Sequence, residues 1–307
     1  MTGSATVSVV IPAYNAAAFI ERTLDSVRAQ TLAASETVVV DDGSSDSTSD
    51  VARAYFAREG MPGRVVRQDN QGIAAARNTG MRAAAGEYVA LLDHDDLWHP
   101  GKLAAVMAEF ERHPQTDLIC HDENITRDGA VLHVSRRRMP TGDLYEALLF
   151  TGNMLSPSAT VFRRDRALAI GGFDERAEYL TVEDYEFWMR FSRQFQIRFL
   201  DRVLGEYVLV ERAASRRIVF HHAALEHMLR NHLDAYLQGH PGLAPRLKAR
   251  RRLARVYRSA ARQLIGYGEA PADQRTLIGR MLRTYPFEPR NLAVALLWIV
   301  HSRRRAS

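Results

Sequence analysis

The stretch "VSVVIPAYNAAAFIERTLDSVRAQTLAASETVVVDDGSS", residues 7–45, decides the fold. Two apolar, β-branched runs at 7–12 and 38–40 flank a segment whose apolar residues recur at helical spacing from Phe19 to Val27. Strands that are apolar throughout, rather than alternating with polar residues, are typical of a parallel sheet covered on both faces. The stretch therefore predicts a strand, a helix and a second, parallel strand.

The same alternation continues to about residue 100. A helix is predicted after the turn at 41–47, a strand in "GRVVRQ" at 63–68, an alanine-rich helix at 72–86 and a fourth strand in "EYVALLD" at 87–93. Strands separated by helices predict an α/β domain in which ligands bind at the carboxyl ends of the strands.

Composition narrows the class of protein. The chain has 307 residues, of which 46% are hydrophobic and 25% charged, as in soluble globular proteins. Its one cysteine, Cys120, lies in an apolar run and is predicted to be a buried hydrophobe in a reducing compartment. The first residues predict a strand rather than a signal peptide, and no apolar run reaches the roughly 18 residues of a spanning helix.

Polar clusters follow three of the predicted strands, as "PAYN", "DDGS" and "DHDD". Asp93 and Asp95 are two residues apart, so on an extended backbone both carboxylates point to one side and His94 points away. Adjacent carboxylates repel unless a cation lies between them, and hard oxygen ligands favour Mg²⁺ or Mn²⁺. The alternative is that these aspartates form a turn and cap a helix beginning near Pro100.

Basic residues are concentrated near the end of the chain. The net charge is +5, and the segment 246–262 holds eight basic residues and no acidic one. A solvated helix face and an anionic membrane surface both fit this pattern. Nucleic acid is not the expected partner, because no aromatic-interleaved basic platform accompanies the charge.

Five motifs, in this order, resemble those of the family 2 glycosyltransferases, which have the A-type nucleotide-sugar fold. They are "VSVVIPAYNAAAFIERTLDSVRAQT", "VVVDDGSSDST", "NQGIAAARNTGMRAAAGEYVALLDHDDLWHP", "GGFDE" and "EDYEFWMRF". The resemblance covers residues 7 to about 210. It implies a Rossmann-like, mostly parallel sheet with helices on both faces, in a catalytic domain at 1–215. Within that domain, 1–100 would bind the nucleotide and 101–215 the acceptor, and 216–307 would be a C-terminal helical extension.

The resemblance also implies a nucleotide site. Asp42 would accept a hydrogen bond from the N3–H of uracil or thymine, and Pro12 and Tyr14 would flank the base. Asp93 would hold the ribose or help to bind the metal. Arg77 would contact the diphosphate or Asp93, with a surface salt bridge as its alternative role.

The catalytic residues follow from the same resemblance. Asp95 would bind the Mg²⁺ or Mn²⁺ that bridges the diphosphate, and Asp184 would be the catalytic base. Without the family, Glu183 and Asp184 also suit the first turn of a helix, where negative charge is favourable. Glu183 is predicted to point about 100° away from Asp184.

The implied function is metal-dependent, inverting transfer of a sugar from a UDP- or dTDP-sugar to a hydroxyl group of a glycan or lipid-linked acceptor, in cell-surface polysaccharide synthesis. The chain departs from the family where "YVLVERAAS" places Val208 and Val210 at positions of an expected arginine and histidine. This departure leaves an inactive nucleotide-sugar-binding protein as an alternative, and a nucleotidyltransferase with the same sheet and metal aspartates is a second one.

Segments after residue 101 are expected to bind the acceptor and to extend the fold. A hairpin turning at Asp128–Gly129 and a loop with a strand in "TGNMLSPSATVFRR" should carry the acceptor site. The chain turns helical after about residue 215. In "LAVALLWIVHSRRR" an apolar run precedes three arginines, a pattern typical of interfacial helices. We therefore expect a cytoplasmic protein, either with peripheral contact to the inner face of the cell membrane or with these helices packed on the catalytic domain.

Overall fold

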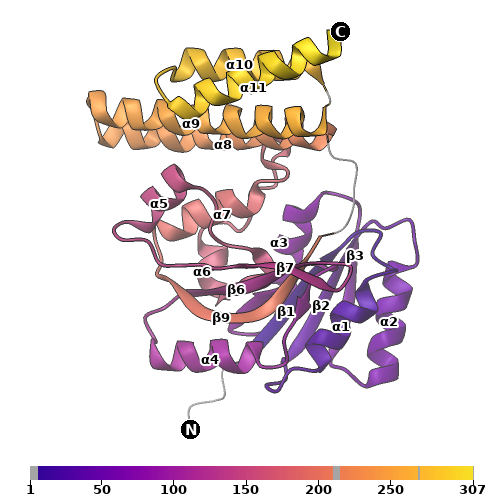
Figure 1. Ribbon diagram of the computed structural model, residues 1–307. Helices are drawn as coiled ribbons and strands as arrows, with labels where there is room; N and C mark the ends of the chain where they lie inside the picture. Colours follow the sequence, from indigo (N-terminus) through magenta and orange to yellow (C-terminus); the bar gives the residue numbers. More distant parts are fainter. Residues whose placement is uncertain (1–5, 210–214, 269, 307) are drawn as a thin grey trace. The chain divides into compact units, whose positions relative to one another are not determined.

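The structure is a computed structural model that describes residues 6–209, 215–268 and 270–306 (Figure 1). The chain divides into two compact units. The sheet unit comprises residues 1–145, 153–175 and 183–210, and the helical unit comprises residues 146–152, 176–182 and 211–307. Two short segments before the predicted boundary at 215, residues 146–152 and 176–182, belong to the helical unit. The division into a catalytic domain and a C-terminal extension stays a prediction.

The sheet unit is built on one sheet. In the described residues its strands are β1 (Val7–Ala13), β2 (Glu36–Asp42), β3 (Gly63–Gln68), β4 (Tyr88–Leu91), β5 (Leu97–Trp98), β6 (Leu118–Arg127), β7 (Ala130–Ser135), β8 (Thr160–Arg163) and β9 (Ile197–Val208). Their order is β3-β2-β1-β4-β8-β6-β9-β5, with β7 paired to β6. Strands β3, β2, β1 and β4 are mutually parallel, and β8 runs antiparallel to both β4 and β6.

Helices cover both faces of the parallel half. The helices of the sheet unit are α1 (Ile20–Arg28), α2 (Thr48–Glu59), α3 (Ile73–Ala83), α4 (Lys102–Arg112), α6 (Arg164–Ala169), α7 (Glu183–Ser192) and the 3₁₀ turn η1 (Pro157–Ala159). Successive side chains of a strand point to opposite faces. Val39 therefore joins the core formed with α1 and α2, while Val38 and Val40 pack with Ala76 of α3.

The sequence predicted the first half of this unit better than the second. The four predicted strands and the three intervening helices are confirmed, as are the hairpin at Asp128–Gly129 and the strand after the 151–159 loop. Strands β5 and β9 were not predicted. Figure 1 shows β9 as a long curved strand, which pairs in parallel with β6 and antiparallel with β5. The sheet is consequently mixed, with its antiparallel pairs in the second half.

The helical unit contains most of α5 (Leu144–Thr151), the 3₁₀ turn η2 (Ala177–Tyr179), α8 (Ser215–Gly239), α9 (Leu243–Tyr267), α10 (Pro271–Thr284) and α11 (Pro289–Ala306). Tyr257, Ile278 and Met281 are buried in a core of its own, contributed by α9, α10 and α11. Among the described residues, no helix combines the length and the apolar character that crossing a membrane requires.

Candidate active site

Arg77 lies at the centre of the candidate active site. It projects from α3 with only 2% of its surface exposed. Its guanidinium lies 2.9 Å from the carboxylate of Asp93 and 2.7 Å from that of Glu183. The interpretation of Arg77 as a surface salt bridge was therefore wrong, because Arg77 is buried and pairs with carboxylates from both the loop after β4 and α7. A buried guanidinium shared by two carboxylates fixes the position of both.

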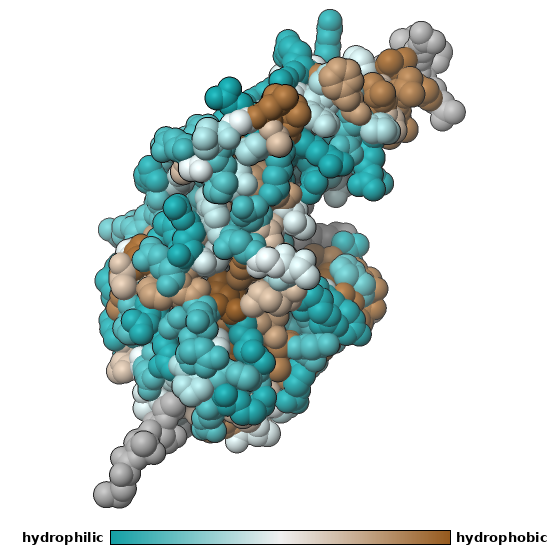
Figure 2. Space-filling view, turned by 90° about the vertical axis from the view of Figure 1, so that its left-hand side faces the viewer, coloured by the Kyte–Doolittle hydropathy of each residue, from teal (hydrophilic) through white to brown (hydrophobic). Residues whose placement is uncertain are grey.

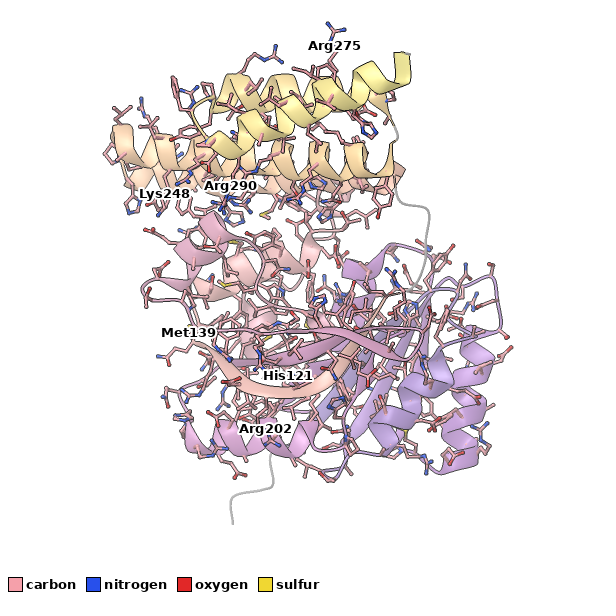
Figure 3. The ribbon with its side chains drawn as sticks, viewed as in Figure 1. His121, Met139, Arg202, Lys248, Arg275 and Arg290 are labelled. Atoms are coloured by element: carbon pink, nitrogen blue, oxygen red, sulfur yellow. The ribbon has the colours of Figure 1, made fainter. Side chains whose placement is uncertain are left out.

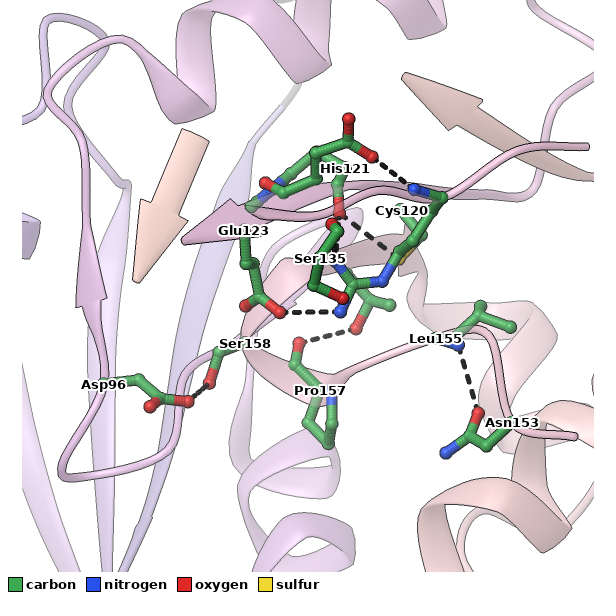
Figure 4. Close-up of polar contacts among 12 residues, drawn as sticks. Asp96, Cys120, His121, Glu123, Ser135, Asn153, Leu155, Pro157 and Ser158 are labelled. Carbon is green, nitrogen blue, oxygen red and sulfur yellow. Dashed lines mark hydrogen bonds and ion pairs between the residues drawn. The ribbon is translucent and has the colours of Figure 1, made fainter. Parts of the chain in front are cut away.

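Asp96 is a structural residue. It is buried, and its carboxylate accepts a hydrogen bond from the Ser158 hydroxyl at 2.5 Å, drawn in Figure 4, and another from the Val208 N–H at 2.9 Å. Burial, together with Asp93 and Glu123, holds the pKa of Asp96 well above its usual range. Asp96 thus joins the loop after β4 to η1 and to the end of β9.

Ser158 holds the same loop from a second direction. Its hydroxyl oxygen accepts from the N–H of Asp93 at 3.0 Å, and its carbonyl accepts from Trp98 and from the buried Lys102. The helix after the loop, α4, begins at Lys102, and its cap residue Gly101 is not an aspartate. The interpretation of these aspartates as caps of that helix was therefore wrong. Nothing in the local sequence reveals Ser158 as their partner.

Asp95 differs from both neighbours. Its backbone carbonyl accepts from Arg22, but within the described residues its carboxylate has no hydrogen-bond or ion-pair partner. The imidazole of His94 lies near β1, with its Nδ1 3.2 Å from the Pro12 carbonyl oxygen. No group of three or more potential protein ligands is found in the described part of the chain. Of the two aspartates predicted to bind the metal, Asp93 is paired with Arg77, and the Asp95 carboxylate has no partner among the described residues.

Asp184 and Glu183 separate as expected at the start of α7. Glu183 is buried against Arg77, whereas Asp184 is partly exposed and accepts a hydrogen bond from the Asn153 side chain at 3.2 Å. Burial, and next the charge of Glu183, raise the pKa of Asp184 to about 7, against the opposing effect of Arg77. A carboxylate with such a pKa accepts protons well near neutral pH.

The predicted base-binding residues meet at the ends of β1 and β2. Tyr14 is 47% exposed, and the loop around it is joined to the next one by the Asn15 side chain, which accepts from Ser45. Asp42 accepts three hydrogen bonds, from Gln68 and from the N–H groups of Gln71 and Gly72. A carboxylate offers about four acceptor positions. Asp42, which is 4% exposed, therefore organises the start of α3, and one of its acceptor positions has no donor among the described residues.

A cavity of about 530 Å³ opens in the sheet unit beside Asn153. It is lined by Glu123, Ile125, Ser135, Arg136, Arg137, Arg138, Asn153, Met154, Leu155, Ser156 and Tyr207. Six of these residues come from the two stretches expected to carry the acceptor site, whereas Ser135 and the three arginines follow the predicted hairpin and Tyr207 lies on β9. β9 ends at Val208, the first position at which the sequence differs from the family pattern. Val210, Glu211 and Arg212 lie outside the described residues.

Two solved structures with a similar fold were determined with nucleotide sugars bound. TarS of S. aureus in complex with UDP-GlcNAc superposes with a TM-score of 0.60 at 18% identity, covering 91% of this chain and 89% of that one. A mannosyltransferase from Pyrobaculum calidifontis, in complex with GDP-Man and Mn²⁺, gives 0.60 at 19% identity, covering 99% and 87%. These likenesses show the fold, an A-type glycosyltransferase domain with further helices.

The sequence identifies the family. The model of glycosyl transferase family 2 matches residues 8–169. The amylovoran biosynthesis glycosyltransferase AmsB of Erwinia amylovora is 33% identical over 68% of this chain and 71% of that protein. An uncharacterized glycosyltransferase of Nostoc sp. is 36% identical over 48% of this chain, and the match spans 46% of that relative. The chain belongs to glycosyltransferase family 2, which disfavours the nucleotidyltransferase alternative.

Proposed function

We propose that the protein transfers a sugar, with inversion, from a UDP- or dTDP-sugar to a hydroxyl group of a glycan or lipid-linked acceptor. The observation that carries the proposal is the ion-pair network of Asp93, Arg77 and Glu183, with Asp184 next to Glu183 in the chain. Arg77 ties the loop after β4 to the start of α7, so the predicted donor site and the predicted base are held in one rigid frame.

The base-binding end of the site suits uracil or thymine. Asp42 keeps one acceptor position, and the N3–H of these bases is a donor of matching kind. Exposed Tyr14 offers an aromatic face beside it. The structural neighbours were solved with different nucleotides, UDP-GlcNAc and GDP-Man, so the nucleotide is our proposal for this chain.

The residues present fit a divalent cation. The Asp95 carboxylate has no partner among the described residues, and Asp93 is held in place by Arg77. A single carboxylate or a pair, completed by phosphate oxygens, is how Mg²⁺ is usually held, and a Mn²⁺-bound neighbour shares the fold. When bound, the ion would neutralise the charge that develops on the leaving diphosphate.

Asp184 takes the proton of the acceptor hydroxyl as its oxygen attacks the anomeric carbon. The Asn153 amide orients this carboxylate, and Glu183 stays paired with Arg77 and does not compete for the role. Direct displacement from the face opposite the diphosphate inverts the anomeric centre. A positioned base of this kind contributes about 10²- to 10⁴-fold in rate.

The 530 Å³ cavity is the proposed acceptor site, since Asn153 both lines it and binds Asp184. The relative AmsB acts in amylovoran biosynthesis, which supports a role in cell-surface polysaccharide synthesis. We further propose that the protein works in the cytoplasm and that its C-terminal helices contact the inner membrane surface, where lipid-linked acceptors are presented.

Titration calorimetry with UDP, dTDP and GDP, each with and without Mn²⁺, tests the donor site. We expect tight binding of a pyrimidine nucleotide only with metal. This binding should be lost in Asp95→Ala and kept in Asp50→Ala, which changes an exposed acid of α2.

The Asp184→Asn variant tests the base. It should bind donor normally, and its rates of transfer and donor hydrolysis should fall by at least about 10²-fold. Binding without metal would contradict the metal site, and an active Asp184→Asn would contradict the base.

A further inference from the structure

A second cavity, of about 770 Å³, lies in the helical unit between α9 and α11. Its lining residues are Arg255, Arg258, Ser259, Arg262, Gln263, Arg290, Ala293, Val294 and Leu297. We call it the arginine groove. It contains no predicted donor or catalytic residue, and glycosyl transfer as proposed above makes no use of it.

The arginine groove carries uncompensated positive charge. Four of its lining residues are arginines and none is acidic. Arg258 donates to the Asn291 side chain at 2.9 Å and Arg255 to the Phe150 carbonyl at 3.1 Å, both neutral acceptors. Among the described residues, none of the four forms an ion pair within 4.0 Å, and the nearby Glu288 is paired with Arg251.

The pKa values of two of the arginines are lowered by this arrangement. Burial, and next the neighbouring Arg252, lower the pKa of Arg255. Burial and Arg290 lower that of Arg258, although Glu288 acts in the opposite direction. Like charges held together without a counter-ion favour an anionic ligand, and guanidinium groups match the geometry of phosphate.

An apolar strip borders the arginine groove on α11. Leu292, Leu296 and Val300 follow one another at intervals of four residues, so they lie along one side of the helix, and more than half of each side chain is exposed. Leu297, 48% exposed, belongs to the groove lining. Figure 2 shows hydrophobic surface gathered on these C-terminal helices, and Figure 3 labels Arg290 among their side chains.

We propose that the arginine groove binds the phosphate groups of anionic phospholipids while the strip of Leu292, Leu296 and Val300 enters the interfacial layer of the bilayer. A free phosphate would use the arginines and leave the strip in water. Nucleic acid would use the charge and gain nothing from aliphatic side chains. A lipid surface uses both, because its phosphates and its acyl chains meet at the interface. This assignment deepens the proposed membrane contact and depends on neither the donor nor the base.

Vesicle flotation with the full chain tests the proposal. The vesicles are phosphatidylcholine alone or an equimolar mixture with phosphatidylglycerol. Wild type should bind the anionic vesicles far more strongly than the neutral ones. Arg258→Gln/Arg262→Gln should weaken that binding by about 25-fold, at about five-fold for each guanidinium near an anionic surface. The matched control Arg246→Gln/Arg275→Gln removes two exposed arginines outside the groove and should have a clearly smaller effect.

Further measurements test the role of the apolar strip and distinguish a lipid from soluble phosphate as the ligand of the arginine groove. Leu296→Gln should weaken vesicle binding and leave any binding of inorganic phosphate unchanged. Equal losses in the control and groove variants would overturn the proposal, because the charge would then act diffusely. Phosphate binding without vesicle binding would overturn the lipid as occupant, and so would concentration-dependent dimers lost in Leu296→Gln. Turnover in vesicle-free solution should be normal in every groove variant, whereas Asp184→Asn should float normally and lack turnover.

Discussion

Three aspartates within four residues meet three different environments. Asp93 is paired with Arg77, Asp95 has a carboxylate without a partner in the described structure, and Asp96 is buried against Ser158. The sequence placed all three at the end of a buried strand, because that follows from local pattern. It did not distinguish them, since their partners come from α3 and η1, which only the tertiary fold brings near.

The raised pKa of Asp184 predicts a pH dependence. A base must be ionised to accept a proton, so kcat/KM should rise about tenfold per unit up to a pH of about 7 and then level off. Donor binding measured by calorimetry over the same range should vary much less, because Asp184 has no predicted role in it. A rate that stays flat between pH 5.5 and 8, with chemistry limiting, would contradict Asp184 as the base.

Arg77 should matter for stability as well as for the site. Arg77→Met leaves Asp93 and Glu183 as unpaired carboxylates near the protein interior, which costs about 3–5 kcal/mol of unfolding free energy. Arg53→Met breaks only an exposed pair with Asp50 and should change stability by about 0.5 kcal/mol or less. Urea denaturation of both variants compares them directly, and equal losses would show that burial of the Arg77 pairs is energetically unimportant.

At the scale of elements, the accuracy of prediction followed the regularity of the pattern. The valine runs of β1 and β2 and the hairpin turn at Asp128–Gly129 were predicted because each has a strong local preference. Strand β9 was missed because Arg198, Asp201 and Arg202 interrupt its apolar residues, and its pairing with β6 supplies what the local sequence lacks. The two-residue β5 exists only as a partner of β9.

Two helical glycines, one packed closely against the sheet and one with room for a methyl group, predict opposite effects of an alanine substitution. A Cβ at Gly80 would lie 2.2 Å from Val10 Cγ1, so Gly80→Ala should lose about 1–3 kcal/mol through overpacking despite its better helix propensity. In α10, a Cβ at Gly279 meets only the flexible end of Arg283 at 3.7 Å. Gly279→Ala should therefore gain about 0.5–1 kcal/mol. Thermal unfolding of both variants measures the sign, and a stabilised Gly80→Ala would contradict the close packing of α3.

At the scale of the whole molecule, the two units have separate cores. Among the described residues, the sheet unit has one core with α1, α2 and α4 and a smaller one with α3, and the helical unit has a core among α9, α10 and α11. All predicted donor and catalytic residues belong to the sheet unit, and the arginine groove belongs to the helical unit. This division was only partly predictable, since residues 146–152 and 176–182 join the helical unit through tertiary contacts that no local pattern encodes.

Separate cores predict that donor binding protects one unit selectively. A ligand at about 100 times its Kd stabilises the state that binds it by about 2.7 kcal/mol, which slows exchange through unfolding of that state about 100-fold. With UDP and Mn²⁺, amides of β1, β2 and β4 should show this protection, and those of α9 and α10 should change little. Hydrogen exchange followed by mass spectrometry resolves the two sets, with Asp95→Ala as the control that should lose the effect. Equal protection of both sets would mean that the molecule unfolds as one cooperative body, in which case the two cores do not act as independent units.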